Sequence, residues 1–384
     1  MSDIFIDASH FAQADQLCEI ISSRKLTVKT QETIAADAAG GCLVFSTAQE
    51  TAMGGRQALI AFARSLKPKL VTIIDPTANH FAIEPSLGGK VIHICLPSDD
   101  RFALTVAADL ICADLSNMIA ADPETSNLLS LASRVAKSDV TVFINGPTGT
   151  GKEVLARFIH DKSARHTAPF VAINCAAIPE NMLEAVLFGH EKGAFTGASM
   201  ANKGIFRAAN LGTLLLDEIS EMPIGLQSKI LRVLQERKVT PLGAQTEIDI
   251  DVRVLATTNR DMRLEIQKNN FREDLFYRLN VFPMATQSLS DRPLDILPIA
   301  VALLRKHAPS LDMIPWLSEC ARDVLLEHSW PGNVRELENV IQRALVLQSG
   351  GVIEAEDIII DVAPMTQMMT TPPAQHAALS RLTS

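Results

Sequence analysis

One segment constrains this chain more than any other, because residues 140–159 read VTVFINGPTGTGKEVLARFI. Residues 140–144 are apolar enough for a buried strand, and a helix is expected to start at Lys152. The turn between them carries three glycines, which leave backbone N–H groups free to surround a phosphate at the positive end of the helix. This G-x-x-x-x-G-K pattern between a strand and a helix predicts a nucleotide-binding loop. The loop consists of Gly146, Pro147, Thr148, Gly149, Thr150, Gly151, Lys152 and Glu153.

A magnesium ion that accompanies the nucleotide needs a carboxylate from elsewhere in the chain. Glu153 stands where such loops usually offer a Ser or Thr hydroxyl to the metal. Residues 211–218, LGTLLLDE, read as a buried strand that closes on Asp217 and Glu218. We expect Lys152 to hold the β- and γ-phosphates of ATP, Asp217 to organise Mg²⁺ through its waters, and Glu218 to polarise the attacking water.

Two further strands end on polar side chains. Residues 169–174 end on Asn174, and residues 252–257 are followed by Thr258 and Asn259. We expect Asn259 to sense the γ-phosphate, and Asn174 to hydrogen-bond Glu218 and hold it idle until ATP is seated. Simple capping of the strand ends is the alternative for both asparagines.

The composition is that of an ordinary globular chain, with 384 residues of which 47% are hydrophobic and 21% charged. A formal net charge of −9 predicts no strong autonomous binding to DNA. The six cysteines are scattered without metal-ligand spacing, which favours a reducing compartment. We find no secretory signal pattern and no apolar run long enough to span a membrane, so the expected location is the cytoplasm.

Residues 1–116 predict a small parallel α/β unit. The expected strands are Ile4–Asp7, Cys42–Ser46, Leu70–Asp75 and Val91–Leu96, and the expected helices are Phe11–Arg24 and Arg56–Leu66. The unit resembles a response-regulator receiver in order and size. A receiver that accepts phosphate places an aspartate at the end of its third strand and a lysine after its fifth. At those places this chain reads Phe45-Ser46-Thr47 and Leu96-Pro97-Ser98. We therefore expect a degenerate receiver-like regulatory domain that is not phosphorylated.

Residues 101–121 carry apolar side chains every three or four positions, which predicts a linking or dimerising helix. The segment Asp122-Pro123-Glu124-Thr125-Ser126 breaks this pattern and opens the next domain. Residues 117–124 are the expected linker.

A loop with an apolar tip is expected between the second and third strands of the nucleotide domain. Its glycines would let the only large apolar residue project, although an ordinary flexible surface loop is the alternative. Its residues are Gly193, Ala194, Phe195, Thr196, Gly197 and Ala198.

The string GAFTGA is the signature of the sigma-54-dependent transcriptional activators, bacterial enhancer-binding AAA+ ATPases, and the chain resembles that family from about residue 125 to 360. The segments GPTGTGKE, LGTLLLDEISEM, FREDLFYRLNV and WPGNVRELENV occur in family order. The resemblance implies an AAA+ P-loop parallel-sheet domain over 125–287 and an all-helical lid over 288–362. It also implies a homo-oligomeric ring, hexamer or heptamer, whose Phe195–Thr196 finger contacts sigma-54 RNA polymerase. The expected lid helices are Ile296–Lys306, Ser318–His328 and Val334–Leu347.

Three arginines receive roles from the same resemblance. Arg272 and Arg278 match the residues that reach across a subunit interface to the γ-phosphate of the neighbour, a task suited to a planar, permanently charged guanidinium. Arg335 matches the lid arginine that reports nucleotide state within its own subunit.

The chain departs from most of the family at its C-terminus. Residues 363–384 hold one formally charged residue, Arg381, and predict a disordered tail in place of a helix-turn-helix domain. The activator would then work from solution, use a DNA-binding activator as partner, or be a truncated relative of a longer protein. Short segments around residues 144–146 and 159–163 favour the flagellar branch of the family. The competing hypotheses are a regulatory subunit that joins or inhibits a full-length activator, and an AAA+ remodeller of other substrates.

Overall fold

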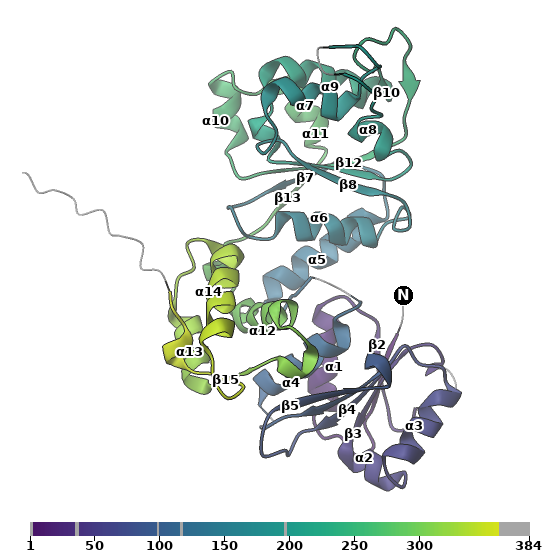
Figure 1. Ribbon diagram of the computed structural model, residues 1–384, viewed down its shortest axis with the longest axis vertical. Helices are drawn as coiled ribbons and strands as arrows, with labels where there is room; N and C mark the ends of the chain where they lie inside the picture. Colours follow the sequence, from purple (N-terminus) through teal and green to yellow (C-terminus); the bar gives the residue numbers. More distant parts are fainter. Residues whose placement is uncertain (1–2, 35–37, 98–99, 116–117, 196–197, 361–384) are drawn as a thin grey trace, which may run out of the picture.

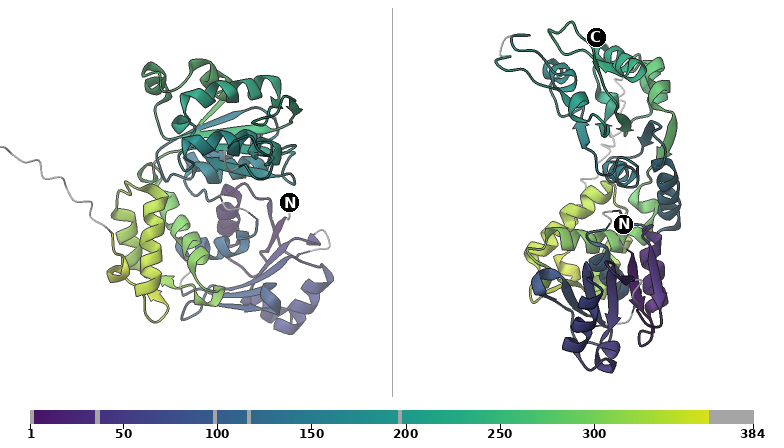
Figure 2. Two further views of the ribbon diagram at one scale, coloured as in Figure 1. Left: turned by 45° about the horizontal axis from the view of Figure 1, so that its top comes forward. Right: turned by 90° about the vertical axis from the view of Figure 1, so that its right-hand side faces the viewer.

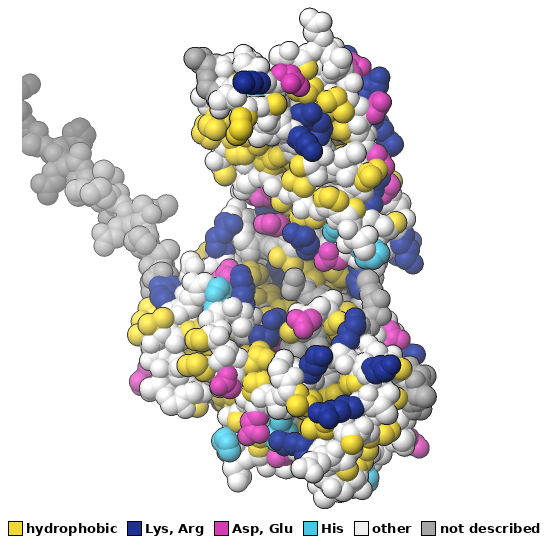
Figure 3. All heavy atoms as spheres, turned by 45° about the vertical axis from the view of Figure 1, so that its right-hand side comes forward, with side chains coloured by type: hydrophobic (Ala, Val, Ile, Leu, Met, Phe, Trp, Pro, Cys, Tyr) yellow, Lys and Arg dark blue, Asp and Glu magenta, His cyan; other side chains and the backbone are white. Residues whose placement is uncertain are grey.

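The structure is a computed structural model that describes residues 3–34, 38–97, 100–115, 118–195 and 198–360. Two units are stacked along the long axis of the molecule (Figure 1). The upper unit is the α/β core that carries the phosphate loop, and the lower unit holds the N-terminal module and the C-terminal helices side by side. The right-hand view of Figure 2 shows a narrow waist between the units. On the face drawn in Figure 3, Lys and Arg side chains are interspersed with Asp and Glu.

The N-terminal module is built on a six-stranded sheet of order β2-β1-β3-β4-β6-β5. The strands β2, β1, β3, β4 and β6 run parallel, and if the parallel strands alone are numbered their order is the 2-1-3-4-5 of flavodoxin-like folds. The remaining strand, β5, pairs antiparallel with β6 at the edge of the sheet. The predicted receiver-like α/β class is therefore confirmed. The strands are β1 (Ile4–Asp7), β2 (Val28–Gln31), β3 (Cys42–Ser46), β4 (Leu70–Asp75), β5 (Ala82–Ser86) and β6 (Val91–Cys95).

Helices cover both faces of this sheet. Helices α1 (Ala14–Ser23) and α4 (Arg101–Cys112) pack on one face, and α2 (Thr47–Ala52) and α3 (Arg56–Ser65) lie on the other. The residue that ends β3 is Ser46, whose hydroxyl donates to His10 O at 2.9 Å and accepts from Gln49 N at 3.1 Å. Ser46 is thus the N-cap of α2. The lack of phosphorylation stays a prediction.

Helix α4 corrects the interpretation of residues 101–121. It ends at Cys112, and all residues from Phe102 to Cys112 are buried between α1 and the lid helix α12 (Ile296–His307). The apolar stripe predicted one buried face, but the residues between its members are mostly apolar too, so the whole circumference is covered within the chain. Of the two predicted alternatives, a dimerising helix is wrong for residues 102–112, since its faces are already occupied, whereas a linking helix fits, since α4 packs on both α1 and the lid.

The upper unit is a five-stranded parallel sheet of order β13-β7-β12-β9-β8. Its strands are β7 (Val142–Asn145), β8 (Phe170–Asn174), β9 (Thr213–Asp217), β12 (Arg253–Thr258) and β13 (Phe282–Ala285). Helices α5 (Pro123–Ala136) and α6 (Lys152–Asp161) pack on one face, whereas α7 (Glu180–Phe188), α9 (Ile224–Glu236) and α11 (Glu273–Leu279) pack on the other. The remaining elements are α8 (Ile205–Ala208), α10 (Met262–Gln267) and the hairpin β10 (Lys238–Val239) with β11 (Ile248–Asp249). The predicted parallel P-loop sheet is confirmed.

The lid contains the three expected helices, α12, α13 (Glu319–Glu327) and α14 (Asn333–Leu347). It is not purely helical, because the two-residue strands β14 (Trp316–Leu317) and β15 (Val352–Ile353) pair in parallel. Short 3₁₀ turns at Leu289–Asp291 and Pro293–Asp295 lead from the core into α12.

The N-terminal module and the lid share one hydrophobic core, which the sequence did not predict. A single cluster of buried side chains joins the α1 and α4 face of the N-terminal sheet to α12, α13 and α14. Trp316 of the lid lies with its ring centroid 5.0 Å from those of Phe81 and Phe102. Asp109 on α4 accepts from Arg24 at 3.1 Å and from Arg305 of α12 at 2.6 Å. The lower unit is therefore one packed body.

All six cysteines are free, and burial raises the pKa of the Cys112 and Cys175 thiols to about 12. Within the described residues, none of the helices has the length and apolar character needed to cross a bilayer.

Candidate functional site

The phosphate loop lies at the carboxyl edge of the upper sheet. Strand β7 ends at Asn145 and α6 starts at Lys152, so residues 146–151 form the loop that the sequence predicted. Gly149 has φ 78°, and a Cβ there would lie 2.6 Å from Gly332 O. Only glycine therefore fits this position without strain, since the lid backbone approaches it directly. Glu153 follows on the exposed side of α6.

Lys152 lies folded against its own loop. It is 6% exposed, and its Nζ donates to Gly146 O at 2.9 Å and Pro147 O at 3.2 Å. The same nitrogen lies 3.7 Å from Glu218 Oε1. Burial lowers the pKa of the Lys152 ammonium, and the Glu218 and Asp217 carboxylates oppose that shift. The ammonium thus faces both the loop and the acidic pair.

The acidic pair lies beside Lys152, as the sequence predicted, but Asn174 contacts a different member of it. The Asn174 Nδ2 donates to Asp217 Oδ2 at 2.9 Å, not to Glu218. The register of the sheet explains this, because Asn174 of β8 stands directly opposite Asp217 of β9. The other Asp217 oxygen accepts from Thr257, a contact that the sequence reasoning missed. The proposed restraint of Glu218 by Asn174 is absent from this state of the site.

Asn259 connects the acidic pair to the phosphate loop. Its backbone N donates to Glu218 Oε2 at 3.2 Å, and its Nδ2 donates to Thr148 Oγ1 at 2.8 Å. This position suits a group that reads the γ-phosphate. The hydroxyl of the neighbouring Thr258 donates to the Ser220 hydroxyl in the protein interior, so Thr258 contributes to packing rather than to the site.

Arg335 lies on the first turn of α14, over the loop. It lines a cavity of about 300 Å³ with Pro147, Thr148 and Asn333, and its charge contributes to the lowered pKa of Lys152. The structure therefore brings Arg335 to the nucleotide site of its own chain.

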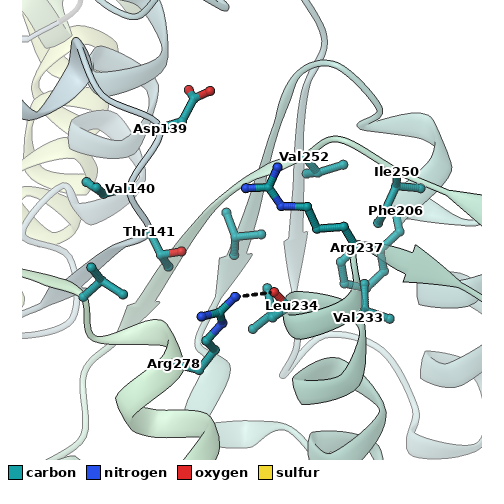
Figure 4. Close-up of a pocket in the computed structure, with 12 residues that line it drawn as sticks. Asp139, Val140, Thr141, Phe206, Val233, Leu234, Arg237, Ile250, Val252 and Arg278 are labelled. Carbon is teal, nitrogen blue, oxygen red and sulfur yellow. Dashed lines mark hydrogen bonds between the residues drawn. The ribbon is translucent and has the colours of Figure 1, made fainter.

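Arg272 and Arg278 are held elsewhere. Arg272 is exposed and makes two hydrogen bonds to Asp274, at 3.0 and 2.7 Å. Arg278 donates to Leu234 O at 2.9 Å and lines a cavity of about 190 Å³ with Arg237 (Figure 4). Residues that precede β7, β12 and β13 border that cavity, so it lies at the opposite edge of the sheet from the phosphate loop. Among the described residues, neither arginine side chain makes a hydrogen bond or ion pair to the phosphate loop or to the acidic pair.

The finger presents its aromatic side chain to solvent. Phe195 is 46% exposed and lies edge-on to His190, with ring centroids 4.9 Å apart. The loop is closed at its base by Gly193 N donating to Ala198 O at 2.8 Å, and Ala198 N donates to Phe195 O at 3.0 Å. Thr196 and Gly197 lie outside the described residues. Ala194 packs beside Gly243.

The donor set at the loop fits a hydrated magnesium ion carried by phosphate. Mg²⁺ keeps several waters and takes one or two carboxylates besides phosphate oxygens, and Asp217 supplies such a carboxylate. The described residues contain no group of three or more His, Cys, Asp or Glu side chains placed to hold a metal by themselves. The fit therefore depends on phosphate as a co-ligand.

A parallel sheet with a phosphate loop, an acidic strand end beside its lysine, and a helical lid over both define an AAA+ ATPase. Residues 118–285 match the sigma-54 interaction domain, and residues 290–374 match the AAA+ ATPase lid domain. The chain belongs to the sigma-54-dependent transcriptional activators.

Similar proteins extend this likeness beyond the matched domains. The response regulator protein FleR of Pseudomonas aeruginosa is 50% identical over 326 residues, which is 83% of this chain and 69% of FleR. The transcriptional regulatory protein FlbD of Caulobacter vibrioides is 44% identical over 80% of this chain and 66% of its own length. The crystal structure of NtrX from Brucella abortus with ADP has a TM-score of 0.60 at 25% identity, and the match covers 97% of this chain and 89% of NtrX. The chain thus spans about two thirds of the length of the two regulators.

Proposed function

We propose that this chain hydrolyses MgATP at sites shared between subunits of a homo-oligomeric ring. The Phe195–Thr196 finger then remodels sigma-54 RNA polymerase so that the closed promoter complex opens. The observation that carries the proposal is the position of Glu218, held between Lys152 Nζ at 3.7 Å and Asn259 N at 3.2 Å at the edge of the sheet where the phosphate loop lies. A carboxylate there is placed to polarise a water against a terminal phosphate.

Lys152 links nucleotide binding to the readiness of Glu218. Its three donor hydrogens now face two loop carbonyls and the Glu218 carboxylate. Phosphate oxygens are stronger acceptors and would take over these donors. Glu218 would then lose its cationic partner and be free to accept from water. Bound Mg²⁺ would neutralise charge on the phosphates, and Asp217 would hold its waters.

The positions of Arg272 and Arg278 support the proposal of a ring. Both side chains are exposed, and their hydrogen bonds go to Asp274 and to Leu234 O rather than to the phosphate loop. An arginine supplied by a neighbour stabilises the charge of the transition state and raises phosphoryl-transfer rates by roughly 10³ to 10⁵. We infer that each site is completed by the next subunit.

We further propose that the promoters served control flagellar genes. The FleR likeness covers 326 residues, more than the matched AAA+ domains contain, so it reaches into the N-terminal module. A DNA-binding activator that joins the ring would bind the DNA site that selects the promoter.

The experiment that tests this function compares ATP turnover with open-complex formation by sigma-54 RNA polymerase on a flagellar promoter. Phe195→Ala removes the exposed tip, so it should lower open-complex formation at least tenfold while ATP turnover stays within about twofold. The contacts of Phe195 within the described residues are with His190 and Ala198, which lie outside the nucleotide site. Met200→Ala, an exposed apolar residue outside the finger, is the matched control. Equal loss of both activities in Phe195→Ala, or wild-type turnover without open complexes on any sigma-54 promoter, would contradict the proposal.

A further inference from the structure

Three consecutive carbonyls of the phosphate loop are each capped from the lid. Asn333 Nδ2 donates to Thr148 O at 3.0 Å, and Val334 N donates to Gly149 O at 3.0 Å. Arg292 Nη2 donates to Thr150 O at 2.7 Å. The first two donors come from the start of α14, and Arg292 comes from the turns before α12. The outer side of the loop is thus held by two separate segments of the lid.

These caps fix the direction of the groups that would bind phosphate. A peptide unit is planar and its C=O and N–H point in opposite directions. A carbonyl held outward by the lid therefore turns the next N–H inward. The three capped carbonyls set the three successive amides of Gly149, Thr150 and Gly151, which belong to the predicted phosphate cradle.

Arg292 is a buried cation whose partners satisfy only part of its guanidinium. It is 5% exposed, its Nε has no partner among the described residues, and burial lowers the pKa of its guanidinium. Its Nη1 lies 3.6 Å from Asp295 Oδ2. A buried ion pair is weak evidence for a gain in stability. What distinguishes Arg292 from other buried arginines is that its Nη2 reaches a carbonyl of the phosphate loop, that of Thr150.

Asp295 ties the same arginine to the start of the ATPase core. Its Oδ1 accepts from Ala121 N at 2.7 Å and Asp122 N at 2.8 Å, and its Oδ2 accepts from Thr125 Oγ1 at 2.6 Å. Arg292 therefore lies between the point where the chain leaves the N-terminal module and the phosphate loop. Asn333 is anchored similarly, because its Oδ1 accepts from Leu289 N at 2.7 Å.

We propose that Arg292 and Asn333 are positioning residues for the nucleotide, which turn the loop amides toward phosphate only while the lid is seated on the loop. The affinity of the loop for the nucleotide phosphates would then depend on whether the lid is in contact with the loop. Neither side chain touches the reacting atoms. The proposal rests on the nucleotide site proposed above and adds the means by which the lid controls it.

The test uses Arg292→Lys in the full chain, which keeps the positive charge beside Asp295 but loses the fork that reaches Thr150 O. We expect KM for ATP and Kd for ADP to rise about tenfold, the equivalent of one lost hydrogen bond of about 1.4 kcal/mol, with kcat within about twofold. Asn333→Asp, which keeps the acceptor for Leu289 N and removes the donor to Thr148 O, should act in the same direction. Binding of adenosine, which has no phosphate, should not change in either variant.

Arg253→Lys is the matched control. Arg253 is also a buried arginine, and its Nε has no partner within the part of the chain that the structure describes. Its Nη1 and Nη2 donate to the backbone carbonyls of Ala136 and Val135, at the end of β12 opposite the loop. Unchanged ADP affinity in both Arg292→Lys and Asn333→Asp, with a fall in Tm like that of Arg253→Lys, would overturn the proposal. A loss of kcat at constant KM would overturn it too. Wild-type protein that fails to bind ADP would instead contradict the nucleotide site itself.

Discussion

At the scale of single residues, Lys152 and Glu218 form an ion pair that occupies the charged groups of both side chains. The ammonium is nearly buried, faces two loop carbonyls and lies within 3.7 Å of the carboxylate. In the proposed mechanism, a bound nucleotide takes over the contacts of Lys152. Glu218 would then become available to polarise water only after phosphate has replaced it beside the lysine. The same geometry assigns Asn174 to Asp217, where it orients the carboxylate expected to hold the metal waters.

Glu218→Gln should abolish turnover without abolishing binding. The amide keeps the shape of the side chain and can still accept from Asn259 N, but it cannot take a proton from water. General-base loss costs roughly 10² to 10⁴ in rate, so kcat should fall at least 100-fold while ADP affinity stays within about threefold. Steady-state hydrolysis and ADP titration measure the two quantities. A variant that retains more than a tenth of wild-type kcat would remove Glu218 from the mechanism.

At the scale of secondary-structure elements, α4 and α12 join the N-terminal module to the lid. The buried Asp109 carboxylate lies between Arg24, the residue that follows α1, and Arg305 of α12. A second ion pair, Arg322 with Asp100 at 2.9 Å, also joins the lid to the N-terminal module but is more exposed to solvent. Because the lid also donates hydrogen bonds to the phosphate loop, a displacement of the N-terminal module would move the lid and so change the loop.

Asp109→Asn should destabilise the lower unit by about 3 kcal/mol, because it leaves a buried guanidinium without its counter-charge. Asp100→Asn is the control, since a half-exposed pair contributes about 1 kcal/mol or less and Asn remains a good N-cap for α4. Hydrogen exchange should show α1, α4 and α12 losing protection together in Asp109→Asn. Loss of protection in α4 alone would mean that module and lid unfold independently.

The sequence predicted the elements whose signals are local. Strands β7, β9 and β12 carry continuous apolar runs, and the loop glycines and acidic pair stand at fixed offsets from them. It missed β2 and β5, whose sequences VKTQ and AIEPS lack such runs, and it misread α4 because helical spacing does not say what covers a helix. Arg292 escaped notice because its partner Thr150 lies 142 residues away in the chain.

At the scale of the whole molecule, the phosphate loop lies where the upper unit meets the lid of the lower unit. The upper unit supplies the phosphate loop, the acidic pair and the exposed Phe195. The lower unit supplies the lid caps, and behind them the N-terminal module in one shared core. The two arginines that would finish the chemistry are exposed on the upper unit and held away from its own site. A single subunit is therefore an incomplete enzyme in this account.

Complementation between two inactive variants tests that claim most directly. Glu218→Gln removes the water-polarising group but keeps the arginines, whereas Arg272→Ala, removing the arginine at the start of α11, keeps Glu218. In a ring of random composition about a quarter of the interfaces would pair an intact Glu218 with an intact Arg272. We predict that ATP turnover, near zero for each variant alone, reappears when the two are mixed and grows with total protein concentration. A mixture that stays as inactive as its components, or an Arg272→Ala variant with wild-type turnover, would contradict a site shared between subunits.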